Sequence, residues 1–302
     1  MSAVIDQAEG EGWALYNGDC VDVARGLPDA SVHFSVFSPP FSGLYIYSAD
    51  TRDMGNSADD AEFFAHFNYL IPELHRVTIP GRLAAVHCKQ LVNYRGRDGM
   101  AGLRDFRGEI IRAFQAHGWA YHSEVCIWKD PVIEMQRTKA HGLLYKQLRA
   151  DSSVSRMGLA EYLLQFRRWP KDEAEAAKIE PVTHTREGFP LPRWQRYASP
   201  VWHDIRQTHV LNVQQARDDR DEKHICPLQL DVIERALTLW SNPGDVVFSP
   251  FAGIGSEGYV ALQQKRRFVG AELKPSYFKQ AVANLRGVGK QRSLFDAPGT
   301  TP

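Results

Sequence analysis

Residues 246–262, VVFSPFAGIGSEGYVAL, carry the clearest fold signal in the sequence. A β-rich run reaches Ser249, a loop with Gly253 and Gly255 follows, and a helical pattern begins directly after it. Glycines at a strand-to-helix turn permit positive φ angles and let a ligand approach the backbone closely. The stretch therefore predicts an α/β unit with a ligand-binding loop. An ordinary turn with the same glycines is the alternative.

A related phrase, VFSPPF at residues 36–41, ends an earlier strand pattern. Its two prolines remove two backbone donors. The neighbouring carbonyls are left as acceptors, Ser38 adds a hydroxyl, and Phe41 adds an aromatic face. These groups suit a site that accepts the N–H bonds of an amino group while a ring stacks on the ring that carries it. The alternative is a Pro-Pro turn that caps a strand.

Strand and helix patterns alternate around both phrases. Strand patterns at residues 13–20 and 32–37 flank a short helix, and a longer helical pattern follows at 59–78. This alternation predicts a mostly parallel sheet with helices on both faces. Such sheets bind ligands at the carboxyl ends of their strands, so we expect the two phrases to meet at one crevice.

The alternation stops in the middle of the chain. Residues 135–222 are polar, contain several prolines and show no sustained strand–helix rhythm. We expect one α/β core in two pieces, residues 1–134 with the VFSPPF phrase and residues 223–286 with the glycine loop, interrupted by an inserted region at 135–222. Residues 287–302 are expected to form a loosely ordered tail.

The strand after the glycine loop points to the kind of ligand. It ends on Glu272, near the distance at which α/β nucleotide sites place a carboxylate on ribose hydroxyls. The third glycine of the dinucleotide fingerprint is missing, and Pro250 and Phe251 are foreign to it. A mononucleoside cofactor fits better than a dinucleotide.

Composition excludes several classes of protein. The 302 residues have a formal net charge of zero and no apolar run long enough to span a membrane, and the acidic N-terminus is unlike a signal peptide. The four cysteines form no CxxC pair, so neither a disulfide framework nor a zinc site is indicated, and no metal is expected. A reducing, cytoplasmic setting fits best.

The neutral net charge hides a basic region inside residues 135–222. Arginines and lysines there are interleaved with Trp169, Trp194, Tyr197 and Trp202. Basic residues with aromatics suit a surface that contacts phosphates and bases. The alternative is a solvated surface over a small satellite core. The residues expected to contact DNA are Arg137, Lys139, Lys146, Arg149, Arg156, Arg167, Arg168, Arg193 and Arg196.

Together the two phrases resemble the motifs of amino-directed DNA methyltransferases, which use S-adenosylmethionine to methylate adenine N6 or cytosine N4. Residues 38–41 match the catalytic (Asp/Asn/Ser)-Pro-Pro-(Tyr/Phe/Trp) motif, and residues 249–256 match the cofactor motif, with Ser249 in place of its usual Asp. The catalytic motif comes first, as in the family's beta group. The resemblance implies a Rossmann-like class I methyltransferase sheet in permuted order, with 135–222 as the target-recognition region.

The resemblance also assigns roles to residues. The catalytic residues would be Ser38, Pro39, Pro40 and Phe41. The cofactor, S-adenosyl-L-methionine, would be bound by Asp19, His224, Pro227, Ser249, Phe251, Gly253, Gly255, Ser256 and Glu272. Tyr45 and Tyr47 either line the pocket or pack within the loop.

The implied function is sequence-specific methylation of a base flipped out of double-stranded DNA. Ser in the first motif position is commoner among cytosine-N4 enzymes, but adenine enzymes are more numerous, which leaves a slight preference for adenine N6. An RNA or protein amino methyltransferase and a catalytically silent DNA-binding relative are the other readings. Attack at cytosine C5 is rejected because Cys226 lies outside the catalytic motif. The chain would be a solitary modifier or the modification half of a restriction-modification pair, and a homodimer is allowed.

Overall fold

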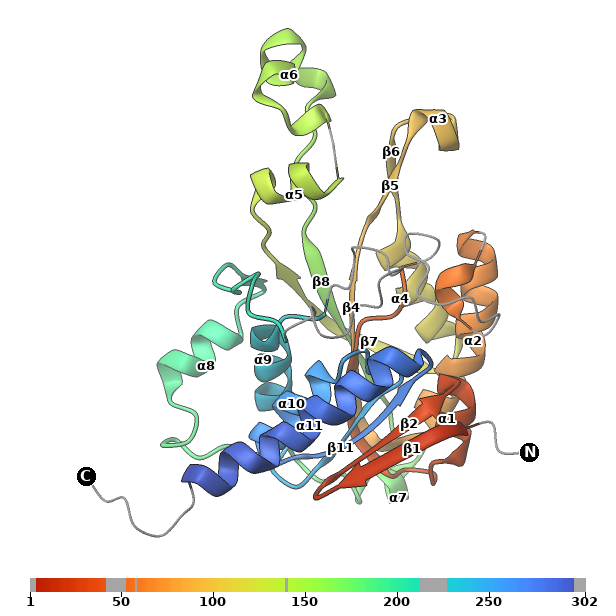
Figure 1. The fold of residues 1–302 in the computed structure, drawn as a ribbon, viewed down its shortest axis with the longest axis vertical. Helices are drawn as coiled ribbons and strands as arrows, with labels where there is room; N and C mark the ends of the chain where they lie inside the picture. Colours follow the sequence, from red (N-terminus) through yellow and green to blue (C-terminus); the bar gives the residue numbers. More distant parts are fainter. Residues whose placement is uncertain (1–3, 42–52, 58, 139–140, 212–226, 296–302) are drawn as a thin grey trace.

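The computed structural model describes residues 4–41, 53–57, 59–138, 141–211 and 227–295. Within them a nine-stranded sheet has the order β1-β2-β11-β10-β3-β4-β8-β7-β9 (Figure 1). Strands β1 and β8 run antiparallel to their neighbours, and the remaining pairs are parallel. The strands are β1 (Val4–Gly10), β2 (Trp13–Gly18), β3 (Val32–Phe37), β4 (Thr78–Lys89), β7 (Trp119–Ile127), β8 (Glu161–Arg168), β9 (Val201–Trp202), β10 (Val246–Ser249) and β11 (Arg267–Glu272), with a separate hairpin of β5 (Leu91–Asn93) and β6 (Gly102–Arg104).

Helices cover both faces of the sheet, which confirms the expected α/β class. Phe34 belongs to the core under α9, α10 and α11, whereas Phe248 of the adjacent strand belongs to the core under α1, α2 and α4. Both rings are fully buried, each contributing about 2 kcal/mol of hydrophobic stabilisation. The helices are α1 (Cys20–Gly26), α2 (Asp60–Val77), α3 (Arg95–Asp98), α4 (Phe106–Ala116), α5 (Pro131–Thr138), α6 (Tyr145–Ala150), α7 (Glu173–Ala176), α8 (Leu191–Tyr197), α9 (Leu230–Trp240), α10 (Ser256–Gln263) and α11 (Pro275–Phe295). None of the described helices combines the length and apolarity that a membrane span requires.

The segment 135–222 does not simply interrupt the core, which changes the expected division of the chain. Its strand β8 lies inside the sheet between β4 and β7, and its strand β9 pairs with β7 at the edge. Leu163, Leu164 and Phe166 of β8 are fully buried. The sequence EYLLQFRR hides this strand because both faces are covered, so its apolar residues do not alternate.

The C-terminal helix is longer than the sequence suggested. Helix α11 continues to Phe295, although residues 287–302 were expected to be a tail. The buried Val288 packs into the core and holds the helix past Gly287, a residue that usually weakens helices.

Two arms extend beyond the carboxyl ends of the parallel strands (Figure 1). One consists of β5, β6 and α3, which follow β4 in the chain. The other consists of α5 and α6, which connect β7 to β8. Because β7 runs parallel to β3 and β4, this second arm rises from the same edge of the sheet at which β3 ends.

Candidate active site

The VFSPPF phrase and the glycine loop line one pocket at the carboxyl ends of β3, β10 and β11, the crevice expected from sequence. All four residues from Ser38 to Phe41 contribute to its wall. The pocket is also lined by six of the residues expected to bind a cofactor: Asp19, Pro227, Phe251, Gly253, Ser256 and Glu272. Ser249 lies fully buried in β10, and Gly255 is the N-cap of α10 at the end of the loop. His224, Tyr45 and Tyr47 lie outside the described residues.

The glycine loop is held by Glu272. Its carboxylate accepts hydrogen bonds from the backbone N–H of Gly253 at 2.8 Å and of Lys274 at 2.8 Å. Gly253 and Gly255 have φ angles of 53° and 87°, which favour glycine, and a Cβ on Gly255 would lie 3.2 Å from Ala281. Burial raises the pKa of Glu272 to about 7. One carboxylate thus shapes the loop and faces the pocket.

Asp19 follows β2 and caps the N-terminus of α1, at the wall of the pocket. Its side chain accepts from the backbone N–H of Val21 at 2.8 Å and of Asp22 at 3.2 Å. The side chain of Asn17 donates to the carbonyls of Glu272 and Leu273, tying β2 to the end of β11. These contacts place Asp19 and Glu272 on the same pocket wall.

Ser38 begins a chain of polar contacts that runs into the sheet. Its Oγ lies 3.0 Å from His87 Nδ1, and His87 Nε2 lies 3.1 Å from Glu161 Oε2. Lys129 Nζ forms an ion pair with the same oxygen at 2.5 Å. Apart from the half-buried Ser38, these side chains are buried. His87, Glu161 and Lys129 were not predicted from the sequence. They lie on β4, on β8 and after β7, and they belong to no local motif.

The aromatic residue of the motif sits beside this chain. The Phe41 ring is half-buried, with its centroid 6.2 Å from that of His87 and 6.1 Å from that of Phe106. Lys89 Nζ lies 5.9 Å from the centre of the same ring. The ring is thus anchored from within while part of it stays accessible at the pocket.

The pocket residues that were not expected from sequence include Asp53, Met54, Glu257, Lys274 and Tyr277. Glu257 is buried at the start of α10, and burial raises its pKa to about 8. The Oγ of Ser256 is buried at this wall and has no hydrogen-bond partner within the described part of the chain. The pocket wall therefore contains one buried hydroxyl, that of Ser256, to which the described residues give no hydrogen bond.

Replacing Glu257 by Gln is expected to stabilise the protein at pH 8 relative to the parent. The folded state keeps this carboxyl protonated up to about pH 8, whereas the unfolded chain ionises it near 4.5. Its contribution to stability is therefore complete below about pH 4.5 and is lost as the pH rises to about 8. Urea unfolding at pH 5 and pH 8 measures the effect, with Glu11→Gln as control. A variant that loses as much stability between these pH values as the parent would contradict the prediction.

The residues expected to contact DNA do not form one surface. Lys146 and Arg149 are exposed on the α5–α6 arm, with Arg156 following. Arg167 and Arg168 end β8 opposite the start of β7, at the other end of the sheet from the pocket. The side chain of Arg137 and all of Lys139 lie outside the described residues.

The position of Arg168 corrects the expectation for that residue. Its guanidinium donates to the carbonyls of Arg76 and Thr78, where α2 ends and β4 begins. Since its Nη1 donates to this chain junction, Arg168 stabilises the fold.

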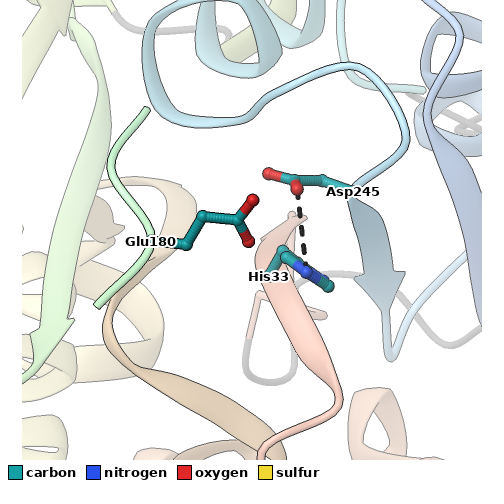
Figure 2. Close-up of side chains that lie close together, drawn as sticks. All are labelled: His33, Glu180 and Asp245. Atoms are coloured by element: carbon teal, nitrogen blue, oxygen red, sulfur yellow. Dashed lines mark ion pairs between the residues drawn. The ribbon is translucent and has the colours of Figure 1, made fainter. Parts of the chain in front are cut away.

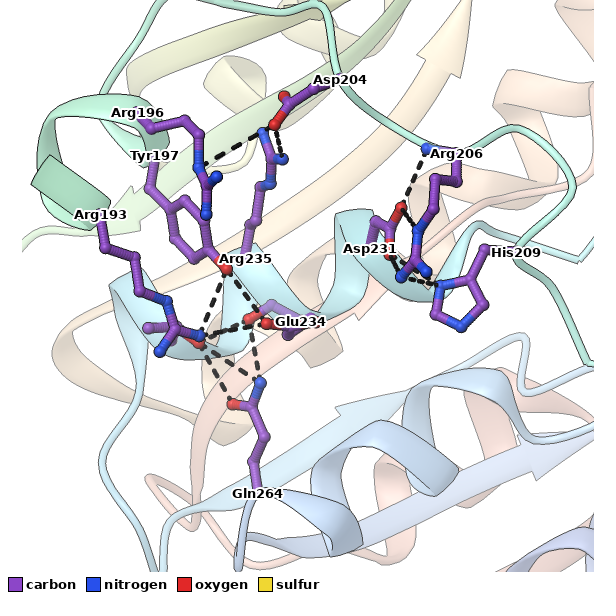
Figure 3. Close-up of polar contacts among 11 residues, drawn as sticks. Arg193, Arg196, Tyr197, Asp204, Arg206, His209, Asp231, Glu234, Arg235 and Gln264 are labelled. Atoms are coloured by element: carbon purple, nitrogen blue, oxygen red, sulfur yellow. Dashed lines mark hydrogen bonds and ion pairs between the residues drawn. The ribbon is translucent and has the colours of Figure 1, made fainter. Parts of the chain in front are cut away.

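Arg193 and Arg196 are held against α9 by the contacts in Figure 3. Arg193 donates to Tyr197 Oη at 3.3 Å and to Glu234 at 3.1 Å, and Arg196 forms an ion pair with Asp204 at 3.9 Å. The pair with Glu234 fastens α8 to α9, so Arg193 serves packing, whereas the side chain of Arg196 is largely exposed.

The described residues bring together one set of side chains with metal-ligand atoms, His33, Glu180 and Asp245 (Figure 2). It lies at the amino ends of β3 and β10, away from the pocket. His33 Nδ1 accepts from the Val246 N–H, so in the neutral ring Nε2 carries the proton and offers no lone pair. Arg82 already pairs with Asp245 at 2.5 Å. We assign this set to the fold, not to a metal.

The fold is that of the class I methyltransferases. A family model described as DNA methylase matches residues 32–283, and the chain belongs to this family of N6/N4 DNA methyltransferases. The family implies DNA as substrate, and the cofactor is S-adenosylmethionine.

Individual relatives are similar over most of the chain. The type II methyltransferase M.Cfr9I of Citrobacter freundii is 25% identical over 91% of this chain and 88% of its own. A Thermus thermophilus protein assigned as a DNA modification methylase, solved with S-adenosyl-L-methionine, has a TM-score of 0.63 and 24% identity, covering 95% of each chain. The cytosine-N4-specific PvuII DNA methyltransferase has a TM-score of 0.60 and 16% identity, covering 92% of this chain and 90% of its own.

The pocket suits this cofactor. Phe251, Ile254 and Pro227 supply apolar wall, while Glu272 supplies an acceptor that ribose hydroxyls require. Gly253 leaves open space where any other residue would place a Cβ, and the Ser256 hydroxyl, which has no partner among the described residues, is available to a ligand. Apolar walls with a few polar groups are typical of small-molecule sites.

Proposed function

We propose that the protein methylates the exocyclic amino group of a base flipped out of double-stranded DNA at a specific sequence. The observation that carries this proposal is that the Ser38–Pro39–Pro40–Phe41 phrase and the glycine loop share one pocket. A base within a duplex cannot bring its amino group to such a pocket, so flipping is required. Where a partner nuclease exists, the protein would be the modification half of the pair.

In this proposal the cofactor supplies the methyl group, and the residues of the chain position the amine. Ser38 Oγ and the Pro39 carbonyl accept the two amine N–H bonds, and Phe41 stacks on the base. These contacts draw the nitrogen towards tetrahedral geometry, which directs its lone pair at the methyl group. Glu272 would hold the ribose. The other residues that the resemblance assigns to the cofactor are Asp19, His224, Pro227, Ser249, Phe251, Gly253, Gly255 and Ser256.

Adenine N6 is the first candidate for the modified group, because adenine enzymes are more numerous in the family. Cytosine N4 is the second candidate. The serine at the first motif position and the similarity to the cytosine-N4-specific PvuII enzyme favour the second. Nucleoside analysis of genomic DNA, from cells with and without the protein, distinguishes N6-methyladenine from N4-methylcytosine. Modification mapping on the same DNA gives the recognition sequence.

A substrate panel tests the proposal against its alternatives. Duplex DNA, structured RNA and protein are each incubated with the protein and cofactor carrying a labelled methyl group. We expect label in duplex DNA. Label in RNA or protein alone would make it a different amino methyltransferase, and DNA retention without label would make it a silent DNA-binding relative. Sedimentation velocity of the same preparation tests whether the protein forms a homodimer.

We expect the α5–α6 arm to contact DNA phosphates. Replacing both Lys146 and Arg149 by Ala should weaken DNA binding about tenfold at moderate salt and lower the slope of log affinity against log salt by about 2. Fluorescence anisotropy over a salt series measures both quantities. The matched control, Lys178→Ala with Arg186→Ala, also removes two exposed positive charges, from near α7. Equal losses in the two double variants would exclude a specific role for the arm.

A further inference from the structure

We propose that His87, acting through Ser38, takes up the proton that the target amine must lose when it is methylated. This inference rests on the proposed function, because it assumes that the amine binds at Ser38. It assigns a function to three residues, His87, Glu161 and Lys129, that have no place in either sequence motif.

The protonation states follow from the contacts. Glu161 is buried; burial alone would raise its pKa, but the hydrogen bond with His87 and the charge of Lys129 outweigh this and hold that pKa well below its usual range. The carboxylate is therefore ionised and can only accept. At 3.1 Å from it, His87 Nε2 must carry a proton, which leaves Nδ1 of the neutral ring as an acceptor.

This arrangement orients the hydroxyl of Ser38. At 3.0 Å from His87 Nδ1, the hydroxyl donates its proton to that nitrogen. The lone pairs of Ser38 Oγ then remain available to the amine of the target base. A serine without this partner could rotate and present its own proton to the amine, which would oppose binding.

The same contacts provide a route for a proton. The lone pair of the amine nitrogen forms a new bond to the methyl carbon of the cofactor. The bond between that carbon and the sulfonium sulfur breaks, and its electron pair stays on sulfur. The nitrogen becomes cationic, so its proton passes to Ser38 Oγ as the hydroxyl proton passes to His87 Nδ1. The products are a neutral methylated amine and an imidazolium beside the Glu161 carboxylate. Loss of this proton to solvent restores the starting state.

A serine, a histidine and a glutamate in a row also occur in hydrolases, but that activity does not fit here. Hydrolysis needs backbone N–H donors beside the serine to stabilise an oxyanion. The two residues after Ser38 are Pro39 and Pro40, which have no N–H. The motif provides acceptors where a hydrolase requires donors.

The test uses His87→Gln, because glutamine can still hydrogen-bond to Ser38 but cannot accept a proton. We expect the single-turnover rate of methyl transfer to DNA to fall about a hundredfold, with the affinities for DNA and cofactor unchanged. His122→Gln, on the exposed side of β7, is the matched control. Glu161 is a poorer choice for substitution, since its loss would leave Lys129 buried and unpaired.

The pH profile separates proton uptake from a purely structural role. The parent rate should fall at low pH, and the His87→Gln rate should lack this limb. The charged groups facing the ring are Glu161 from β8 and Lys129 after β7, with Lys89 across the Phe41 ring. A His87→Gln rate equal to that of the His122→Gln control would overturn the proposal.

A measurement without turnover keeps the proposal testable if the variant does not fold. In ¹H–¹⁵N spectra of the histidine-labelled parent near neutral pH, we expect His87 with Nε2 protonated and Nδ1 bare. A proton on Nδ1 with a bare Nε2 would also overturn the relay. If the parent transfers no methyl group to DNA, the proposed function fails, and these spectra still decide the hydrogen-bond arrangement.

Discussion

Replacing Ser38 and Pro39 together by alanine is expected to lower the rate of methyl transfer to DNA about a thousandfold, while cofactor binding stays largely intact. The change removes the hydroxyl held by His87 and gives residue 39 a backbone donor where the proposal requires acceptors. The proposed cofactor-binding groups lie after β2, before α9, and on β10, β11 and the residues that follow these strands, so they should be unaffected. Single-turnover kinetics and calorimetric titration with the cofactor measure the two quantities.

The matched control is the double alanine variant of Ser199 and Pro200, another Ser-Pro pair, which lies just before β9. It should transfer methyl groups at the parent rate. Parallel loss of transfer and of cofactor binding in the Ser38–Pro39 variant would refute the division of the pocket into an amine site and a cofactor site.

Replacing Glu272 by alanine should weaken cofactor binding about a hundredfold, the second-largest effect we expect. The carboxylate is proposed to accept from the ribose, and it also holds the N–H groups of Gly253 and Lys274. Because burial raises the pKa of Glu272 to about 7, the calorimetric titration is made at pH 8, where the parent carboxylate is ionised.

Two comparison variants accompany this measurement. Glu272→Gln keeps the shape and one acceptor, so its loss of affinity should be smaller than that of Glu272→Ala. Glu9→Ala, on the exposed strand β1, should bind the cofactor like the parent. An unchanged dissociation constant for Glu272→Ala would argue against any contact between this carboxylate and the cofactor.

The parts of the site that the sequence predicted are local in the chain. The residues from Ser38 to Phe41 are consecutive, and so is the glycine loop from Gly253 to Ser256, so prolines, glycines and their neighbours reveal each backbone shape directly. That the two phrases meet followed from the rule that parallel strands end at one edge of a sheet.

The missed parts depend on long-range contacts. His87 lies 49 residues from Ser38 and 74 from Glu161, and only the pairing of β4 with β3 on one side and with β8 on the other brings the three residues together. Without knowledge of the strand pairing, the presence of a His, a Glu and a Lys at these positions does not indicate a shared site. Likewise, Arg168 resembles a DNA contact in the sequence, and only the junction of α2 and β4 shows what its guanidinium binds.

The pairing of β3 with β10 has a consequence for synthesis of the chain. These neighbouring strands are separated by about two hundred residues, so at roughly 5–20 residues per second a ribosome leaves one side of β3 unpaired for tens of seconds. An apolar strand edge exposed for that time can pair with other nascent chains. Cofactor cannot protect it, because the glycine loop is translated after the same delay. The nascent chain therefore passes through an interval in which aggregation and chaperone capture compete with completion of the sheet.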